Sequence, residues 1–246
     1  MTLRGVDVSN HQGEVDWPQV AGAGFAFAFM KASEGVTFTD PFFAQNWERS
    51  RKQGLTRGSY HFARPNWNAP EAEAAKFVSV VANAGGLLPG DMVCLDMEDD
   101  GVAPGGMDLA DWSLRWLRAV EMVLGVRPVF YSGRWYLEPR GLWNNGELSA
   151  YPWWLAAYGE EAPPFARFWQ HSSTGAVPGV QGNCDLNIFF GDAAALRALG
   201  MQDSQPDPAR DWQTAIDVTR GWSRQLAQAS KELADVAGIL ERLRPL

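Results

Sequence analysis

The chain has 246 residues, of which 46% are hydrophobic and 12% aromatic, and its net charge is −8 at pH 7. This composition supports a full-sized hydrophobic core and excludes a globally disordered chain. The acidic charge argues against a nucleic-acid partner, because phosphate binding needs clustered Lys and Arg. It also disfavours long-range attraction to an anionic cell wall, so any such attraction would have to be local.

No segment approaches the roughly 18 apolar residues that span a membrane. The first residues, MTLRGVDVSN, lack the apolar stretch and cleavage site of a signal peptide. We therefore expect release by lysis or a holin-type route, association with a phage particle, or non-classical export. Cys94 and Cys184 cannot build a disulfide framework and lack zinc-site spacing, so we expect two buried free thiols.

Strand-like and helix-like patterns alternate through the first half of the chain. Short apolar runs predict strands at residues 4–9, 24–33, 57–62, 91–98 and 127–132. Helical spacing and end signals predict helices from Thr39-Asp40-Pro41 to Gly54, from Asn68 to Ala84, and from Asp108 to Leu124. This βα repetition indicates a parallel sheet, and closure into a barrel is the simplest way to protect its edges.

The pattern changes after residue 150. Apolar runs at 153–158, 166–172 and 184–190 are separated by short stretches rich in Gly and Pro. These gaps leave little room for crossover helices, so we expect the last strands to be antiparallel, at least in part. The predicted fold is an α/β protein with a (β/α)5β3 TIM-like barrel over residues 1–202.

The C-terminal region has a different composition. Residues 203–210 (DSQPDPAR) predict a Pro-containing linker, and residues 211–246 predict a long amphipathic helix. Its apolar stripe recurs at alternating spacings of three and four, with Thr219 as its one polar member: Trp212, Ile216, Thr219, Trp222, Leu226, Ala229, Leu233, Val236, Leu240 and Leu243. The stripe over residues 211–244 fits a helix packed on its own barrel, a coiled coil in a homo-oligomer, or a docking element for another protein.

Two acidic residues close the predicted strand at 91–98. Asp96 and Glu98 are two residues apart, so their side chains should point to the same face, with Cα atoms roughly 6.5 Å apart. Carboxylates at the end of an apolar barrel strand are costly unless they are paired, hydrated or used. In barrels of this type that end carries the active site. The alternative is an ordinary acidic loop, because Asp99 and Asp100 follow directly.

Other predicted strands carry polar groups near the same end. If the barrel closes as predicted, they converge on one rim: Asp7, Tyr60, His61, Tyr131, Gln170, His171 and Asp185. A single buried Asp is more often structural than catalytic, but four acids at strand ends favour catalysis. Metal catalysis is the rival interpretation. The three histidines show no HxxxH or HxH pattern, so we expect neither a metal nor another cofactor.

The chain contains twelve tryptophans, several of them in predicted loops or at strand ends: Trp67, Trp135, Trp143, Trp153 and Trp154. Aromatic faces stack on sugar rings in many carbohydrate sites. Each tryptophan taken alone is more often a packing residue.

Nine stretches together resemble glycoside hydrolase family 25, the lysozymes of the Chalaropsis type, which include many phage endolysins. They cover roughly residues 1–200 in the expected order: GVDVSNHQGEVDWPQV (5–20), GFAFAFMKASEG (24–35), FAQNW (43–47), GSYHF (58–62), LDMED (95–99), FYSG (130–133), WWLAAY (153–158), FWQHS (168–172) and CDLNIF (184–189). Residues 201–246 lie outside the resemblance, and no wall-binding module is recognisable there.

The resemblance implies an N-acetylmuramidase that hydrolyses the β-1,4 bond between N-acetylmuramic acid and N-acetylglucosamine, with bacterial peptidoglycan as its partner. Glu98 falls at the family's general acid, and Asp96, Asp7 and Asp185 fall on the other acidic positions of its cleft. The remaining matches to positions that line the sugar site are Tyr60, Tyr131, Trp154 and Gln170. Virion-associated relatives make the C-terminal helix a candidate for assembly.

We expect burial and the neighbouring Asp96 to raise the pKa of Glu98, so that Glu98 donates a proton while Asp96 stays ionised. The nucleophile remains open between the substrate's 2-acetamido group oriented by Asp96, direct attack by Asp96, and water. Two rival functions also remain: a sugar-binding barrel without catalysis, and an enzyme of the same chemistry acting on chitin.

Overall fold

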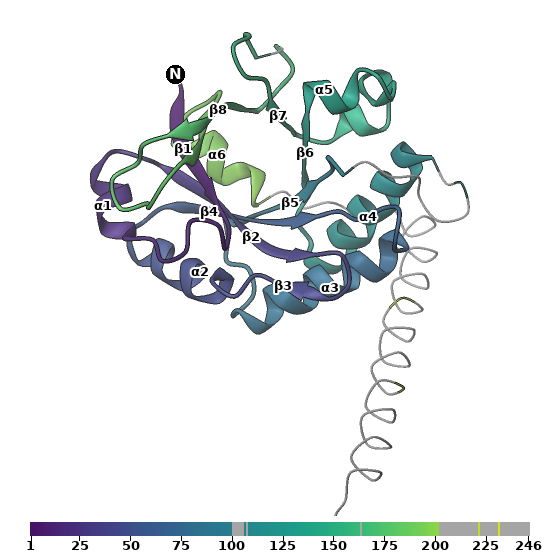
Figure 1. The fold of residues 1–246 in the computed structure, drawn as a ribbon, viewed down its shortest axis with the longest axis horizontal. Helices are drawn as coiled ribbons and strands as arrows, with labels where there is room; N and C mark the ends of the chain where they lie inside the picture. Colours follow the sequence, from purple (N-terminus) through teal and green to yellow (C-terminus); the bar gives the residue numbers. More distant parts are fainter. Residues whose placement is uncertain (100–105, 107, 163, 202–220, 222–230, 232–246) are drawn as a thin grey trace, which may run out of the picture.

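A computed structural model describes residues 1–99, 106, 108–162, 164–201, 221 and 231 of the chain. Within these residues, eight strands close into a barrel in the order β1-β2-β4-β5-β6-β7-β8-β9, and β9 pairs back to β1 (Figure 1). The short β3 pairs with β2 alone. The strands span Leu3–Val8 (β1), Phe27–Glu34 (β2), Phe38–Thr39 (β3), Thr56–Phe62 (β4), Met92–Asp96 (β5), Val129–Gly133 (β6), Trp153–Ala156 (β7), Phe168–Gly175 (β8) and Cys184–Phe189 (β9).

Helices follow most of the strands and cover the outside of the barrel. The α-helices span Trp17–Gly22 (α1), Phe43–Lys52 (α2), Pro70–Asn83 (α3), Leu109–Leu124 (α4), Arg134–Leu137 (α5) and Ala193–Leu199 (α6). Two 3-10 turns, Leu142–Asn144 and Leu148–Ala150, lie between β6 and β7. In Figure 1, α2 and α3 lie along the same side of the sheet, beneath β2 and β3.

Local sequence signals explain where α4 begins and ends. The Asp108 carboxylate accepts a 2.6 Å hydrogen bond from the backbone N–H of Ala110, which caps the first turn. Gly125 ends the helix with φ 67°, a left-handed conformation that glycine adopts without a Cβ clash. The same helix buries Trp112, Trp116 and Leu117. Its amphipathic pattern therefore docks it against the barrel.

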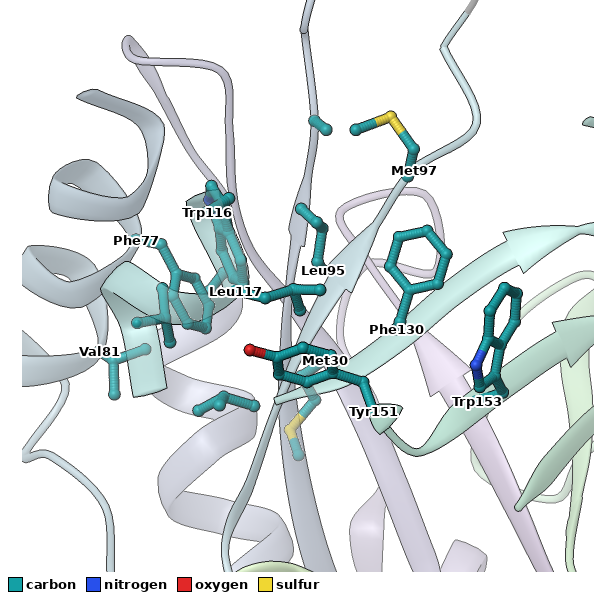
Figure 2. Close-up of a cluster of buried hydrophobic side chains, with 14 of the residues drawn as sticks. Met30, Phe77, Val81, Leu95, Met97, Trp116, Leu117, Phe130, Tyr151 and Trp153 are labelled. Carbon is teal, nitrogen blue, oxygen red and sulfur yellow. The ribbon is translucent and has the colours of Figure 1, made fainter. Parts of the chain in front are cut away.

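The core has two layers. Inward-facing side chains fill the barrel, among them Phe27, Phe29 and Phe168, while a larger layer packs between the strands and the helices. Part of that outer layer appears in Figure 2: Met30, Phe77, Val81, Leu95, Met97, Trp116, Leu117, Phe130, Tyr151 and Trp153. Gly58 is the register partner of Phe29, and a Cβ there would lie 2.1 Å from the phenyl ring. A glycine at this position makes room for the aromatic interior.

Side chains alternate between the two faces of β5. Cys94 faces the barrel interior, whereas Val93, Leu95 and Met97 belong to the outer layer. The strand itself ends at Asp96, so Glu98 lies two residues beyond it and not within it.

The last strands are antiparallel in part, as expected: β7 and β8 run parallel to β6, whereas β9 runs antiparallel to both of its barrel neighbours. Two other expectations are corrected. The helix expected to open at Thr39 begins at Phe43, because residues 38–39 pair with β2 as β3. A helix that we did not predict, α6, follows the last strand.

The predicted linker at 203–210 lies outside the described residues. So does the predicted C-terminal helix, apart from Gly221 and Lys231, which are both helical. A Cβ on the buried Gly221 would lie 3.0 Å from the backbone oxygen of Glu71 in α3. Among the described residues, no helix combines the length and apolar content that crossing a bilayer requires.

Candidate active site

A cleft of about 350 Å³ opens at the end of the barrel where the parallel strands finish. It is lined by all eight residues that we predicted for the site: Asp7, Tyr60, Asp96, Glu98, Tyr131, Trp154, Gln170 and Asp185. Seven further residues share the lining: Ser9, His11, Gln12, Lys31, Phe62, Trp135 and Tyr158. The carboxyl ends of parallel barrel strands carry the active sites of such folds, so the position of this cleft fits catalysis.

Strand geometry brings the four acids to this cleft. Asp7, near the end of β1, is the register partner of Asp185, at the start of the antiparallel β9. Asp96 closes β5, and its backbone oxygen accepts a 2.9 Å hydrogen bond from the N–H of Ala63. Glu98 follows in the segment that leaves the strand. The reversal of β9 therefore places an acid from the start of a strand beside acids from strand ends.

Asp7 is held by two side-chain amides. Its Oδ2 accepts hydrogen bonds from Gln170 Nε2 at 2.9 Å and from Asn187 Nδ2 at 2.7 Å. Gln170 Oε1 in turn accepts from the hydroxyls of Tyr131 at 3.0 Å and Tyr158 at 2.6 Å. Burial, and then the neighbouring Asp185, raise the pKa of Asp7 well above its usual range, while the two amides oppose the rise. This network fixes one wall of the cleft.

Asp96 is buried, and its Oδ1 makes no hydrogen bond within the part of the chain that the structure describes. An unpartnered buried acceptor costs about 1–3 kcal/mol, so it is uncommon unless a ligand uses it. Burial raises the pKa of Asp96 well above its usual range, the charge of Glu98 raises it further, and Lys31 opposes both effects. Asp96 also lines the cleft, so its carboxylate borders the space that a substrate would enter while Oδ1 itself is buried.

Burial also raises the pKa of Glu98, followed by repulsion from Asp185, while a hydrogen bond from Tyr131 and the charge of Lys31 oppose the rise. We expected burial to act in this way. The repulsive neighbour differs from our expectation: Asp185 acts on Glu98, and Glu98 acts on Asp96. A protonated carboxyl at Glu98 is what a general acid needs near neutral pH.

The aromatic residues predicted for the sugar site are largely buried. Tyr60 is 9% exposed, Tyr131 5% and Trp154 2%. Trp154 stacks on Phe29 at 4.3 Å between ring centroids, and its indole N–H donates to Asn187 Oδ1 at 2.8 Å. These rings form the floor of the cleft, and they leave almost no face on which a sugar could lie.

Two histidines that we expected at this rim lie elsewhere. His61 is fully buried on the outer side of β4, where its ring bonds Ser33 Oγ and Glu73 Oε2, each at 2.8 Å. Adjacent residues of a strand face opposite sides, so Tyr60 enters the cleft and His61 cannot. His171 packs against Trp169 and is not among the residues that line the cleft.

The sequence did not single out Lys31, Asn187 or Tyr158. Lys31 was hidden in an apolar run that we assigned to a buried strand. Its spacing of two and four residues from Phe29 and Phe27 was the available signal, because those residues share one face of β2. Asn187 lies two residues after Asp185 on β9, so the same argument would have found it.

The arrangement suits acid–base chemistry. Four carboxyl groups with raised pKa values meet one lysine and several hydroxyl and amide groups in a confined cleft. Among the described residues, no group of three or more His, Cys, Asp or Glu side chains has the geometry to hold a metal ion. Glycosidases commonly use two carboxyl groups whose surroundings give them different pKa values.

Comparison with known proteins identifies the family. The sequence model of glycosyl hydrolases family 25 matches residues 6–180. Lysozyme M1 of Streptomyces globisporus is 36% identical over 215 residues, which cover 80% of this chain and 71% of that protein. The N,O-diacetylmuramidase of Chalaropsis sp is 30% identical over 200 residues, which cover 72% of this chain and 92% of that protein.

Solved structures agree with the sequence comparison. The crystal structure of the bacterial lysozyme from Streptomyces coelicolor superposes with a TM-score of 0.72 at 34% identity, covering 80% of this chain and 96% of that one. The family resemblance seen in the sequence is thereby confirmed, and the closed barrel is the fold of these enzymes. The chain belongs to glycosyl hydrolases family 25 and is a lysozyme, an N-acetylmuramidase.

Proposed function

We propose that Glu98 is the general acid and Asp96 the orienting carboxylate in hydrolysis of the β-1,4 bond between N-acetylmuramic acid and N-acetylglucosamine in peptidoglycan. The observation that carries this proposal is the pair of acids at the end of β5. Both line the cleft, burial raises both pKa values, and Asp96 Oδ1 has no partner among the described residues.

The two acids hold one proton between them in the resting enzyme. Two neighbouring carboxylates with little solvent cannot both ionise easily, so the first ionisation suppresses the second. Burial raises the pKa of Asp96 well above its usual range and also raises that of Glu98, so burial alone would favour the proton on Asp96. In this proposal, Lys31, the largest influence that lowers the pKa of Asp96, and the bound substrate together keep the charge on Asp96 and the proton on Glu98.

In the reaction, Glu98 gives its proton to the glycosidic oxygen as the bond from that oxygen to C1 breaks. The Asp96 carboxylate, which lines the cleft, accepts the N–H of the 2-acetamido group, whose carbonyl oxygen attacks C1. Water then opens the resulting ring and returns a proton to Glu98, with net retention. Direct attack by Asp96 would also retain the configuration, whereas direct attack by water would invert it.

Asp7 and Asp185 have a supporting role in this proposal. They lie on paired strands; Asp185 raises the pKa values of Asp7 and Glu98, and Asp7 raises that of Asp96. Tyr131 stays protonated, because burial and the charge of Glu98 raise its pKa well above its usual range. Its hydroxyl therefore remains a hydrogen-bond donor within the cleft.

Outside the barrel, our proposals rest on sequence alone. Residues 203–210 act as a linker, and the stripe over 211–244 forms a helix that packs on its own barrel, pairs in a homo-oligomer, or docks on a virion or another partner. The enzyme acts at the bacterial cell wall and reaches it by lysis, by phage association or by non-classical export.

The test is mass spectrometry of the sugars released from purified peptidoglycan after borohydride reduction. The wild type should give reduced muramic acid ends. Glu98→Gln should give almost none, because the amide cannot donate the proton that the leaving oxygen needs. NMR of the first product would then separate the routes: an inverted anomer would contradict attack by the acetamido group or by Asp96.

Glu48→Gln is the matched control, since Glu48 is an exposed residue of α2 paired with Lys52. That variant should release the same ends as the wild type. Circular dichroism would show that both variants fold. Reduced glucosamine ends from the wild type would mean that the neighbouring bond is cut, and wild-type turnover by Glu98→Gln would remove Glu98 from the role of acid.

A further inference from the structure

Two exposed aromatic rings border the cleft. Trp135 is 51% exposed and Tyr158 42% exposed, and both line the cavity that holds the four acids. Their ring centroids are 5.7 Å apart and their planes are inclined by 30°. The other aromatic residues of the lining, Tyr60, Phe62, Tyr131 and Trp154, are not among the exposed large side chains. Phe62 is partly exposed, and Trp135 and Tyr158 are the most exposed Trp, Tyr or Phe rings of the described lining.

Neighbouring strands bring the two rings together. Trp135 follows the end of β6 and Tyr158 follows the end of β7, and these parallel strands pair through Gly133 and Ala156. Arg134 reaches across to Glu160 and also bonds Glu138. This exposed ion pair links the start of α5 to the segment that carries Tyr158.

Each ring also has its own support. A Cβ on Gly133 would lie 2.3 Å from atoms of the Trp135 indole, so the indole rests directly on the glycine. The Tyr158 hydroxyl donates to Gln170 Oε1 at 2.6 Å, and Gln170 donates to the carboxylate of Asp7. The Tyr158 ring is thus linked to the same network that fixes the acids. Both rings are held before any ligand arrives, which lowers the entropy cost of binding.

We infer that Trp135 and Tyr158 form a sugar-stacking platform for an N-acetylhexosamine ring of the glycan strand. The C–H groups on one face of a pyranose are apolar and match an aromatic face, while its hydroxyl groups need the polar partners that the rest of the lining supplies. This inference rests on the proposed function for the identity of the glycan. It moves the stacking role from Trp154, which is 2% exposed, to two residues that the cleft leaves open.

The experiment measures binding without turnover. Isothermal titration of the Glu98→Gln variant with peptide-free glycan strands, released from peptidoglycan by an amidase, gives a reference affinity. In that background, Trp135→Ala should weaken binding about tenfold and Trp135→Phe much less, because the phenyl ring keeps part of the stacking face. Gly133→Ala keeps the indole, but the added methyl group pushes the indole away from residue 133, so this variant should also weaken binding.

Phe165→Ala is the matched control. Phe165 is an aromatic residue that is 47% exposed, but it lies before β8, at the opposite end of the barrel. Its removal should leave the affinity for the glycan unchanged. In the active enzyme, Trp135→Ala should raise KM about tenfold and leave kcat within about twofold, since the platform binds substrate and transition state alike.

Affinity unchanged in Trp135→Ala, or no measurable binding by Glu98→Gln itself, would overturn the inference. A loss in Trp135→Ala without a loss in Gly133→Ala would overturn the claim that the glycine presets the indole. These outcomes are separate from failure of the proposed function, which would be seen as absent muramic acid ends with the wild type. If the barrel binds glycan but does not cleave it, Trp135→Ala should still weaken glycan binding.

Discussion

The Lys31 ammonium lies 2.6 Å from Glu34 Oε2, and the other oxygen of that carboxylate accepts two hydrogen bonds from Arg64. Arg64 also pairs with Asp99 at 3.0 Å, next to Glu98 in the chain. A line of alternating charges therefore runs from the segment after β5 back to the lysine of the cleft. Because Glu34 is held on both sides, Lys31 stays in the cleft beside the acids and does not swing into solvent.

Replacing Lys31 with Met should shift the pH–rate profile to higher pH. Lys31 lowers the pKa values of Asp96 and Glu98, so its loss raises both. Ionisation of Asp96 sets the acid limb, which moves up, and kcat/KM at pH 5 should fall about tenfold. Steady-state rates between pH 4 and 9 would check this. Lys52→Met, which removes an exposed lysine of α2, should leave the profile unchanged. An unmoved acid limb in Lys31→Met would separate the lysine from Asp96.

Asp96→Asn should abolish activity and yet stabilise the fold at neutral pH. Burial raises the pKa of Asp96 in the folded state, so the folded protein binds this proton more tightly than the unfolded chain. The folded state therefore loses relative stability as the pH rises above about 4, where an unfolded Asp ionises. The neutral amide avoids this loss and should raise the melting temperature by about 2–4 °C at pH 7.

The stabilisation by Asp96→Asn should depend on pH, and it should be present at pH 7 and absent at low pH. Below about pH 4 both states of the wild type carry a protonated Asp96, so the difference in melting temperature between the two proteins should vanish. Differential scanning calorimetry at pH 3.5 and pH 7 tests both halves of the argument. A variant less stable than the wild type at pH 7 would show that Asp96 makes favourable contacts that outweigh its desolvation.

Asn187→Leu should destabilise the barrel and slow the reaction together. The side chain of Asn187 donates to Asp7 at 2.7 Å and accepts from Trp154 at 2.8 Å. Leucine would leave a buried carboxylate short of one donor and a buried indole N–H without its acceptor, at a cost of about 2–4 kcal/mol. Urea denaturation would measure the cost, and kcat should fall by more than KM changes. Asn83→Ala, at the exposed end of α3, should leave both quantities unchanged.

The positions of the acids could be predicted because strand period and barrel topology decide them. Asp7 and Asp96 close apolar runs, and parallel strands present their carboxyl ends at one rim. Which aromatic residues remain open could not be predicted. Trp154 and Trp135 are both tryptophans at predicted strand ends or loops, but Trp154 is covered by Phe29 from another strand, whereas Trp135 turns outward over Gly133. Contacts between strands that are distant in the sequence decide which aromatic side chains are exposed. The residue pattern within one strand carries no information about those contacts.

The sequence pattern also could not show that β7 and β8 run parallel to β6. Short gaps normally imply antiparallel neighbours, because a parallel return needs a crossover. The connection from β6 to β7 is not one of these short gaps, and there α5 and two 3-10 turns return the chain to the start of the barrel. The connection from β7 to β8 covers residues 157–167 and holds no helix among its described residues, yet β8 pairs parallel with β7. The rule that a parallel return needs a crossover helix therefore fails for this gap.

Arg57→Met should unfold the barrel more easily without affecting the chemistry of the folded enzyme. The guanidinium of Arg57 is buried, bonds Asp91 through two nitrogens, donates to the backbone oxygen of Trp47 at 2.7 Å, and lies 3.9 Å above the Trp47 ring. Removing one partner of a buried ion pair leaves an uncompensated charge and costs about 3–5 kcal/mol. Thermal unfolding would measure the loss, while kcat below the transition should stay at the wild-type value.

The second half of this test replaces both partners. Arg57→Met combined with Asp91→Leu removes the stranded carboxylate, so the double variant should recover stability relative to Arg57→Met alone. The exposed pair of Lys52 and Glu48 is the control, and its disruption should cost less than about 1 kcal/mol. A double variant no more stable than the single one would mean that the contacts of Arg57 with Trp47, and not the charge of Asp91, account for the loss.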